Sequence, residues 1–262
     1  MPIVVATWNV NSIRARMHLL LPWLAEVSPD IVCLQETKVQ DSSFPAEEIE
    51  HAGYHVVFSG EKSYNGVAIL SNAPIEGVSA GFDDGGPPDA ARLLAAETYG
   101  ITLLNTYVPQ GRDLDHEMFE YKLVWFGRLR SLVERRFKTS DRILWVGDLN
   151  VAPTPMDVWW SSERPDAEHV CYHPRVTAAL ETVTAWGFED VFRKHHPEPE
   201  QFTYFDYRLK DGVESGKGWR IDHMLASAPL VETCSASWID LAPRNGERPS
   251  DHTPLLASFD LS

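Results

Sequence analysis

Cysteine and basic residues are scarce in this chain, and both shortages limit what the protein can be. The 262 residues include only three cysteines, which are Cys33, Cys171 and Cys234. Three widely spaced thiols do not form a disulfide framework, so we expect a reducing, cytoplasmic environment. Lysine and arginine number 23 against 38 aspartates and glutamates, a formal net charge of −15. A general nucleic-acid coat protein would be basic, so any polyanionic substrate needs a local basic surface or metal ions to overcome the repulsion.

Long apolar runs and several common catalytic motifs are also missing. No apolar stretch approaches the ~20 residues of a membrane helix, so we expect no membrane contact. The first eight residues lack a charged start and predict a strand rather than a signal peptide. No serine is flanked by the glycines of a nucleophile elbow, and no glycine-rich nucleotide-binding loop is present. His169, Cys171 and His173 form a short tract without a fourth ligand nearby, which disfavours a zinc site.

The remaining sequence has ample material for an apolar core and alternates between strand and helix patterns. Hydrophobic residues make up 44% of the chain, and nine of its aromatic residues are tryptophan. The expected strands are 3–10, 31–34, 55–59, 66–71, 93–98, 101–107, 143–146, 202–205, 221–226, 233–239 and 254–259. The expected helices are 19–27, 45–52, 114–137 and 177–186, with Pro22 in a first turn. Residues 81–89, 153–173 and 208–218 are expected to be loops.

No composition change or linker divides the chain, which favours one domain over residues 1–262. Hairpins mixed with long crossover helices predict an α+β sandwich, in which helices cover the outer faces of two mixed β-sheets.

Residues 142–150 contain the clearest functional signal. Ile143 to Val146 is a short apolar run typical of a buried strand, and Gly147 lets the backbone bend. Asp148 and Asn150 follow and point to the same side of an extended chain. A rigid core strand would then present a carboxylate and a carboxamide together, although Asp and Asn before prolines often only start a turn.

The same pattern recurs along the chain, and the recurrence favours a functional interpretation over a plain turn. Polar residues lie at the ends of expected strands in six different segments: Asn9, Glu36, Tyr107, Asp148, Asn150, Asp222, Asp251 and His252. Several convergent carboxylates suit a hard cation such as Mg²⁺, or Mn²⁺, which prefers oxygen ligands. Such a cation suits phosphoryl chemistry, because it neutralises phosphate oxygens and lowers the pKa of a bound water.

Longer motifs around these residues resemble the exonuclease III-type AP endonuclease family, within the endonuclease/exonuclease/phosphatase superfamily. The resemblance covers almost the whole chain. Asp-His and Gly-Asp-x-Asn elements mark only the superfamily. The more specific motifs are Leu-Gln-Glu-Thr-Lys at 34–38, Tyr-Val-Pro-Gln-Gly at 107–111 and Phe-Asp-Tyr-Arg at 205–208.

The resemblance implies a four-layer αββα sandwich with the site at one end, between the sheets. It implies a Mg²⁺-dependent DNA-repair nuclease that cuts 5′ to abasic sites, with 3′-to-5′ exodeoxyribonuclease and 3′-phosphodiesterase activity. Carried over by motif, the catalytic residues are Tyr107, Asp148, Asn150, Asp222 and His252. The implied metal set is Asn9, Glu36, Asp148, Asn150, Asp251 and His252, with Glu36 as the principal ligand. Which group is the general base, and whether one or two metals act, stays open.

The resemblance also implies double-stranded DNA, preferably damaged or abasic, as the partner of a monomeric protein in a bacterial or archaeal cytoplasm. The implied DNA contacts are Arg92, Gln110, Lys122, Tyr204, Phe205, Trp219 and Arg220, with Trp219 in the wall of a pocket for an extruded abasic sugar. Asn11 departs from the pattern, because some relatives carry an aspartate there that assists the metal. The alternatives are another phosphodiesterase or phosphatase of the superfamily, and a catalytically silent relative that binds nucleic acid or protein.

Overall fold

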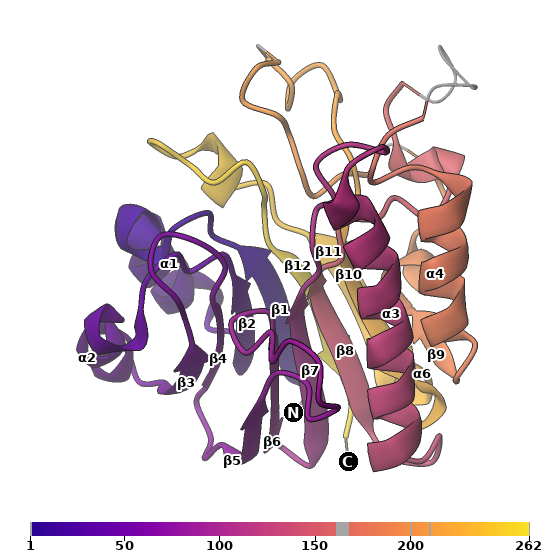
Figure 1. Ribbon diagram of the computed structural model, residues 1–262. Helices are drawn as coiled ribbons and strands as arrows, with labels where there is room; N and C mark the ends of the chain where they lie inside the picture. The colour runs from indigo at the N-terminus through magenta and orange to yellow at the C-terminus, as the bar shows by residue number, and fades with distance from the viewer. Residues whose placement is uncertain (1, 161–167, 200, 210, 262) are drawn as a thin grey trace.

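Two mixed β-sheets pack face to face in the computed structural model, which describes residues 2–160, 168–199, 201–209 and 211–261 (Figure 1). The first sheet has the order β11 (Cys234–Ile239), β12 (Leu255–Phe259), β1 (Ile3–Asn9), β2 (Ile31–Gln35), β4 (Val67–Ser71) and β3 (His55–Ser59). The second has the order β5 (Glu76–Ala80), β6 (Leu93–Thr98), β7 (Ile101–Tyr107), β8 (Ile143–Asp148), β10 (Asp222–Ser227) and β9 (Phe188–Asp190). Strands β1 and β2 pair in parallel, as do β7 and β8, and the other neighbours are antiparallel.

Helices cover the outer face of each sheet, as Figure 1 shows. Helices α1 (Ile13–Val27) and α2 (Ala46–His51) pack on the first sheet, and α3 (Glu117–Arg136) and α4 (Pro174–Thr184) pack on the second. The shorter elements are α5 (Val191–His195), α6 (Ala228–Thr233), η1 (Asp41–Ser43), η2 (Pro155–Asp157) and η3 (Pro243–Asn245). The predicted α+β sandwich is therefore confirmed.

Strand alternation explains the four layers. In β8, Leu144 and Val146 enter the core between the sheets, whereas Ile143 and Trp145 enter the core beneath α3. Because successive side chains of a strand point to opposite faces, a strand that is apolar at every position must be covered on both sides. The continuous apolar runs of the sequence thus require helices outside the sheets.

Helix α1 differs from its prediction, because it begins at Ile13 and contains Pro22 in its interior. Pro22 lies on the exposed face, while Leu20, Trp23 and Leu24 are buried against the first sheet. Proline in a helix interior removes one backbone hydrogen bond, but on the exposed face water can satisfy the carbonyl that is left. Burial of the apolar face therefore outweighs the local penalty.

The predicted strand at 202–205 is wrong. Thr203 and Tyr204 donate their backbone N–H groups to the carbonyl of Trp219, whereas Phe205 donates to the carbonyl of Asp251. The segment contacts two different parts of the chain and forms only isolated bridges, so no continuous strand can form. Prediction also missed β5, β9, α5 and α6, which are too short or too polar to give a clear period. Within the predicted loops 153–173 and 208–218, residues 161–167 and 210 lie outside the described residues.

The structure agrees with two compositional features. Among the described residues, no helix combines the length and apolarity needed to cross a membrane. Cys33, Cys171 and Cys234 are all buried, unpaired thiols.

Candidate active site

Strand direction brings the predicted site residues to one end of the sandwich. Figure 1 shows both chain termini at the opposite end, so that β1 carries Asn9, its last residue, to the site end. Asp148 is the last residue of β8, and Asp222 is the first residue of β10. Because β8 and β10 are antiparallel, these two residues lie directly opposite each other in the register. Residues far apart in sequence thus meet at the ends of both sheets.

Asn9 connects the two sheets at the site. Its Nδ2 donates to Glu36 Oε1 at 2.8 Å and to Asp148 Oδ2 at 2.9 Å. Glu36 follows β2 in the first sheet, whereas Asp148 ends β8 in the second. One fully buried carboxamide therefore holds two carboxylates close together, and their separation depends on the packing of the two sheets.

A second carboxylate pair surrounds His252. Its Nδ1 lies 2.8 Å from Asp222 Oδ2, and its Nε2 lies 3.7 Å from Asp148 Oδ2. Burial lowers the pKa of His252, but the charges of Asp222 and Asp148 raise it to about 10. Burial also raises the pKa of Asp148, which remains at about 7 although His252 lowers it. The predicted Asp222–His252 contact is present, and it holds Nδ1 toward Asp222 and leaves Nε2 facing Asp148.

Asn150 fixes the position of Asp148 rather than pointing its amide nitrogen into the site. Its backbone N–H donates to Asp148 Oδ1 at 2.9 Å, and its side-chain Nδ2 donates to the Val108 carbonyl at 3.0 Å. Asn150 has a φ of 51°, in the left-handed region that asparagine tolerates better than most residues. The tight turn after β8 therefore holds the Asp148 carboxylate from behind.

Tyr107 and Asp251 complete the polar end of the site. Burial, together with the nearby charges of Glu36 and Asp148, raises the pKa of the Tyr107 hydroxyl well above its usual value. Tyr107 therefore remains a neutral donor at any physiological pH. Asp251 accepts a hydrogen bond from Asn11 Nδ2 at 2.9 Å.

A cavity of about 500 Å³ opens beside these groups. Its lining contains the polar residues Glu36, Asp148 and His252 and several aromatic residues. The aromatic residues include Trp159, Trp160, His169, Tyr204 and Trp219, and the Tyr204 ring lies 4.9 Å from that of His252. The ring of His169 lies 4.4 Å from that of Trp219, and Trp160 lies 5.7 Å from Trp219. The cavity therefore combines negatively charged catalytic groups with a stacking surface.

The structure places some of the predicted DNA-contact residues at the cavity and others away from it. Gln110, Tyr204 and Trp219 line the cavity. Arg92 is half-buried, and its guanidinium lies 4.9 Å from the centre of the Tyr107 ring. Phe205 is 3% exposed and lines a separate hollow of about 180 Å³, so it does not face the cavity.

The predicted DNA contact by Lys122 is wrong, because its side chain is fully buried. The Nζ donates to the carbonyls of Asn150 at 2.6 Å, Val170 at 2.7 Å and Gln110 at 3.2 Å. The position on α3 brings its ammonium beneath three loops of the site. Lys122 therefore joins these loops and is not available to a phosphate in solvent.

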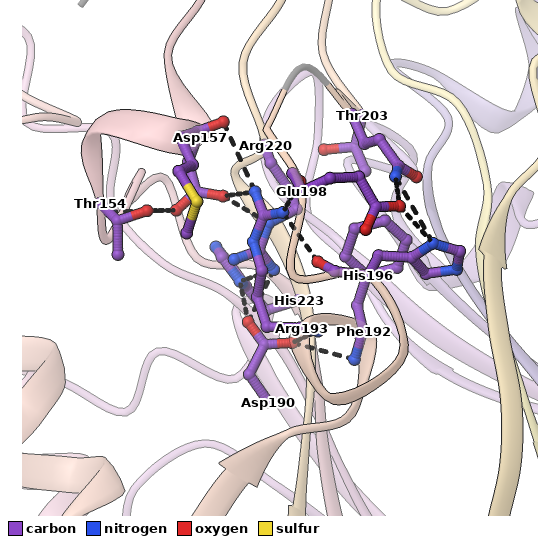
Figure 2. Close-up of polar contacts among 12 residues, drawn as sticks. Thr154, Asp157, Asp190, Phe192, Arg193, His196, Glu198, Thr203, Arg220 and His223 are labelled. Carbon is purple, nitrogen blue, oxygen red and sulfur yellow. Dashed lines mark hydrogen bonds and ion pairs between the residues drawn. The ribbon is translucent and has the colours of Figure 1, made fainter.

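The predicted DNA contact by Arg220 is also wrong. Arg220 is 1% exposed, and it donates to Asp157 and to Asp190 at 2.7 Å in each case. Figure 2 shows this arginine, together with His223 and Arg193, between the two aspartates. We call Asp157, Asp190, Arg193, Arg220 and His223 the buried ion network.

Sequence reasoning missed two groups near the cavity. Lys38 belongs to the motif at 34–38 but had no predicted role. Its Nζ lies 2.6 Å from Glu36 Oε2. His169 belongs to the Cys/His tract, and in the structure its Nδ1 accepts from the Cys171 N–H at 3.2 Å. His173 Nδ1 accepts from the Arg175 N–H at the start of α4. Both histidines thus have local backbone partners, a role that residue type alone does not reveal.

Comparison with known proteins matches this arrangement to one family. The model of the endonuclease/exonuclease/phosphatase family matches residues 6–252. The chain belongs to this family. Exodeoxyribonuclease III from Haemophilus influenzae is 35% identical over 97% of this chain and 98% of its own length.

Solved structures of the family resemble the whole chain. An AP endonuclease from Archaeoglobus fulgidus is 46% identical, with a TM-score of 0.95, and the match covers 99% of this chain and all of that one. A 3′ phosphatase of Neisseria bound to product DNA hairpin is 34% identical, with a TM-score of 0.93, over 98% of this chain and 99% of that one. The predicted family and its αββα fold are thereby confirmed.

Proposed function

We propose that this protein is a divalent-metal-dependent DNA-repair nuclease. It is a hydrolase of the nuclease class, as its family membership and its full-length match to exodeoxyribonuclease III establish. Its proposed reactions are incision of the phosphodiester 5′ to an abasic site, 3′-to-5′ exonuclease action and removal of 3′ blocking groups. The names of an archaeal AP endonuclease and a bacterial 3′ phosphatase among the related structures support this range.

The observation that carries the proposal is that two sets of contacts, one through Asn9 and one through His252, meet at Asp148. Asn9 holds Glu36 beside Asp148, and Asp222 holds His252 beside the same Asp148. A phosphodiester at this point would lie beside Asp148, which can take a proton from water, and beside protonated His252, which can contact a phosphate oxygen. Both are buried at the end of a cavity that is open to substrate.

The residues near Glu36 fit a divalent metal. The Lys38 ammonium lies 2.6 Å from Glu36 Oε2 and 2.6 Å from Asn11 Oδ1, so these oxygens already accommodate a positive charge. Glu36, Asn9 and Asp251 offer carboxylate and amide oxygens, the ligands that Mg²⁺ and Mn²⁺ prefer. Of the other members of the proposed metal set, Asp148 accepts from the Asn9 amide, and Asn150 and His252 each contact Asp148. Asp148, Asp222 and His252 also place potential ligand atoms within 4.8 Å of one another.

The bound metal would supply neutralisation of the phosphate oxygens. The remaining steps belong to the chain itself. Asp148 accepts a proton from the attacking water, because its pKa of about 7 suits a base at neutral pH. His252 keeps its proton and donates from Nε2 to a phosphate oxygen, while Asp222 holds Nδ1. The neutral hydroxyl of Tyr107 donates to the phosphate or to the leaving oxygen.

The proposed partner is double-stranded DNA with a missing or damaged base. Trp219 and Tyr204 form part of an aromatic wall that an extruded abasic nucleotide would contact. Extrusion costs least where the base is absent, which favours such lesions. Arg92 and Gln110 remain the proposed backbone contacts from the predicted set. We further propose that the chain acts as one catalytic domain, as a monomer, in the cytoplasm.

The test is incision of a duplex that contains one abasic analogue, with Mg²⁺ and with a chelator. We expect a metal-dependent nick 5′ to the lesion, and undamaged duplex in parallel separates incision from exonuclease action. Asp148→Asn should abolish the nick, whereas Asp115→Asn, at an exposed position, should leave it unchanged. Absence of any metal-dependent nick would refute the repair function.

A catalytically silent relative is the other candidate, and the site argues against it. In a protein without catalytic activity, selection no longer maintains the catalytic residues. All eight predicted site residues are present, and they include the buried Asn9, Asp148, Asp222 and His252. Burial of several acids at one place is costly for stability, so their joint presence favours catalysis.

A further inference from the structure

Lys38 places a positive charge among the proposed metal ligands. Its Nζ lies 2.6 Å from Glu36 Oε2 and 2.6 Å from Asn11 Oδ1. The other Glu36 oxygen, Oε1, accepts from Asn9, and Asn11 donates to Asp251. The ammonium therefore contacts one oxygen of the carboxylate that is expected to bind the metal. The same ammonium also donates to Asn11 Oδ1.

The backbone holds Lys38 in this position. Glu36 and Lys38 both have left-handed φ angles, 51° and 53°. The Thr37 N–H donates to the Gly66 carbonyl at 3.2 Å, and the Lys38 N–H donates to the Asn65 carbonyl at 2.8 Å. The turn after β2 thus places the glutamate and the lysine at the same rim, where the Lys38 side chain is 29% exposed. Non-glycine residues with positive φ concentrate at functional sites, where the surrounding structure compensates for the strain.

We propose that Lys38 is a built-in counter-ion of the metal site that competes with the divalent cation for Glu36 Oε2 and so weakens metal binding. The inference rests on the proposed function, because it takes Glu36 as a metal ligand. A cation at Glu36 shares the carboxylate with the ammonium, and two positive charges a few ångströms apart repel each other even in a partly solvated site. The partly exposed Lys38 side chain can move away and remain hydrogen-bonded to Asn11 Oδ1.

Asn11 holds the Lys38 ammonium near Glu36 without adding a charge of its own. Its carboxamide accepts from Lys38 through Oδ1 and donates to Asp251 through Nδ2, and it carries no charge. An aspartate at position 11 would pair with the ammonium fully and add a negative charge next to Glu36. With asparagine at position 11, the net charge of the site is therefore one unit more positive than it would be with aspartate there.

The experiment is a Mn²⁺ titration of the DNA-free protein, in which electron paramagnetic resonance measures the free ion and calorimetry repeats the titration with Mg²⁺. Lys38→Gln removes the charge but keeps an N–H donor for Glu36, and we expect Mn²⁺ to bind about tenfold tighter or more. Lys38→Arg keeps the charge and should bind like the wild type. Asn11→Asp should also tighten binding, because it adds negative charge.

The matched control is Lys138→Gln, which makes the same change of net charge. Lys138 is exposed and follows the far end of α3, whose 20 residues span ~30 Å. It should leave the Mn²⁺ affinity unchanged, so that any effect at position 38 is local. Thermal melting without metal verifies that each variant is folded.

The outcomes distinguish this inference from the proposed function. Equal or weaker Mn²⁺ binding by Lys38→Gln, with the wild type and control binding normally, would overturn the counter-ion role and leave the nuclease proposal intact. Retained Mn²⁺ affinity in Glu36→Gln would overturn the metal assignment itself. Tighter binding in Lys38→Gln that disappears when Glu36→Gln is added supports both.

Discussion

Two buried clusters of charge meet at the start of β10, and they differ in how completely their charges are paired. Asp222 belongs to the catalytic cluster with Asp148 and His252, and the neighbouring Arg220 belongs to the buried ion network. In the network, Arg220 donates to Asp157 and Asp190, and Arg193 donates to Asp157. In the catalytic cluster, one histidine lies between two carboxylates, and Asp222 Oδ1 has no hydrogen-bond partner among the described residues.

The pKa values follow this difference. Burial raises the pKa of Asp157 and Asp190, but Arg220 and its neighbours hold both below the usual value. For Asp148, burial and two further acids hold the pKa at about 7, despite His252. A carboxylate with matched arginines is a structural group, whereas an excess of buried acid leaves a carboxylate that can exchange a proton near neutral pH.

The largest expected effect comes from Asp148→Asn in the catalytic cluster. We expect kcat on abasic duplex to fall by about 10³-fold or more, because the proton acceptor is lost. The unfolding free energy should stay equal or rise, because the substitution removes a buried charge that burial destabilises. Steady-state kinetics and urea denaturation measure the two quantities. Full retention of activity would remove Asp148 from its proposed role.

The opposite pattern is expected for Arg220→Met in the buried ion network. Removing the arginine leaves Asp157 and Asp190 without their main partner, which should reduce the unfolding free energy by about 3–5 kcal/mol. Arg208→Met is the matched control, since the Arg208 side chain is 88% exposed and should have little effect. A stable Arg220→Met protein in urea denaturation would show that the network does not hold β10 in place.

Lys122→Met should have an intermediate effect, because Lys122 is buried like the network but contacts the loops of the catalytic cluster. Three carbonyls lose their donor, so we expect a loss of about 1–3 kcal/mol in stability together with a lower kcat. A buried lysine neutralises no DNA phosphate, so the salt dependence of KM should not change. A weaker salt dependence of KM in the variant would instead indicate that Lys122 contacts DNA, as the sequence had predicted.

The smallest expected effect, taken per pH unit, is a difference in how the stability contributions of the two clusters respond to pH. The His252 pKa is raised from 6.5 to about 10, so its contribution to stability is complete below pH 6.5 and is lost as the pH rises toward 10. The pKa values of Asp157 and Asp190 are lowered, so their contribution is complete above their unfolded value of 3.8 and is lost in acid. Each titrating group changes stability by at most about 1.4 kcal/mol per pH unit.

Urea denaturation from pH 2 to 10, with chelator present, measures these slopes. Asp222→Asn should flatten the alkaline slope, since it removes the carboxylate that raises the His252 pKa most, and it should leave the acid slope unchanged. An unchanged alkaline slope would show that Asp222 does not hold the proton on His252.

Strand ends were predictable from the sequence, because an apolar run followed by a polar residue requires a buried strand that stops at the surface. Glu36 and Asp148 were identified in this way, and His252 was identified as a polar residue just before the last strand. The strand pairings then place all three at one end. Short elements such as β9 and α5 were not predictable, since three to five residues give no usable period.

Burial was the property that the sequence could not supply for charged residues. Lys122 and Arg220 have the residue types of DNA contacts, and nothing in their neighbours indicates the carbonyls and aspartates that surround them. Phe205 has the type of a pocket residue but faces a different hollow. The sequence by itself therefore determined the family, the layers and the acids of the site, through local patterns. Only the tertiary structure decided which charges are paired, because a partner's distance depends on how the two sheets and their loops pack.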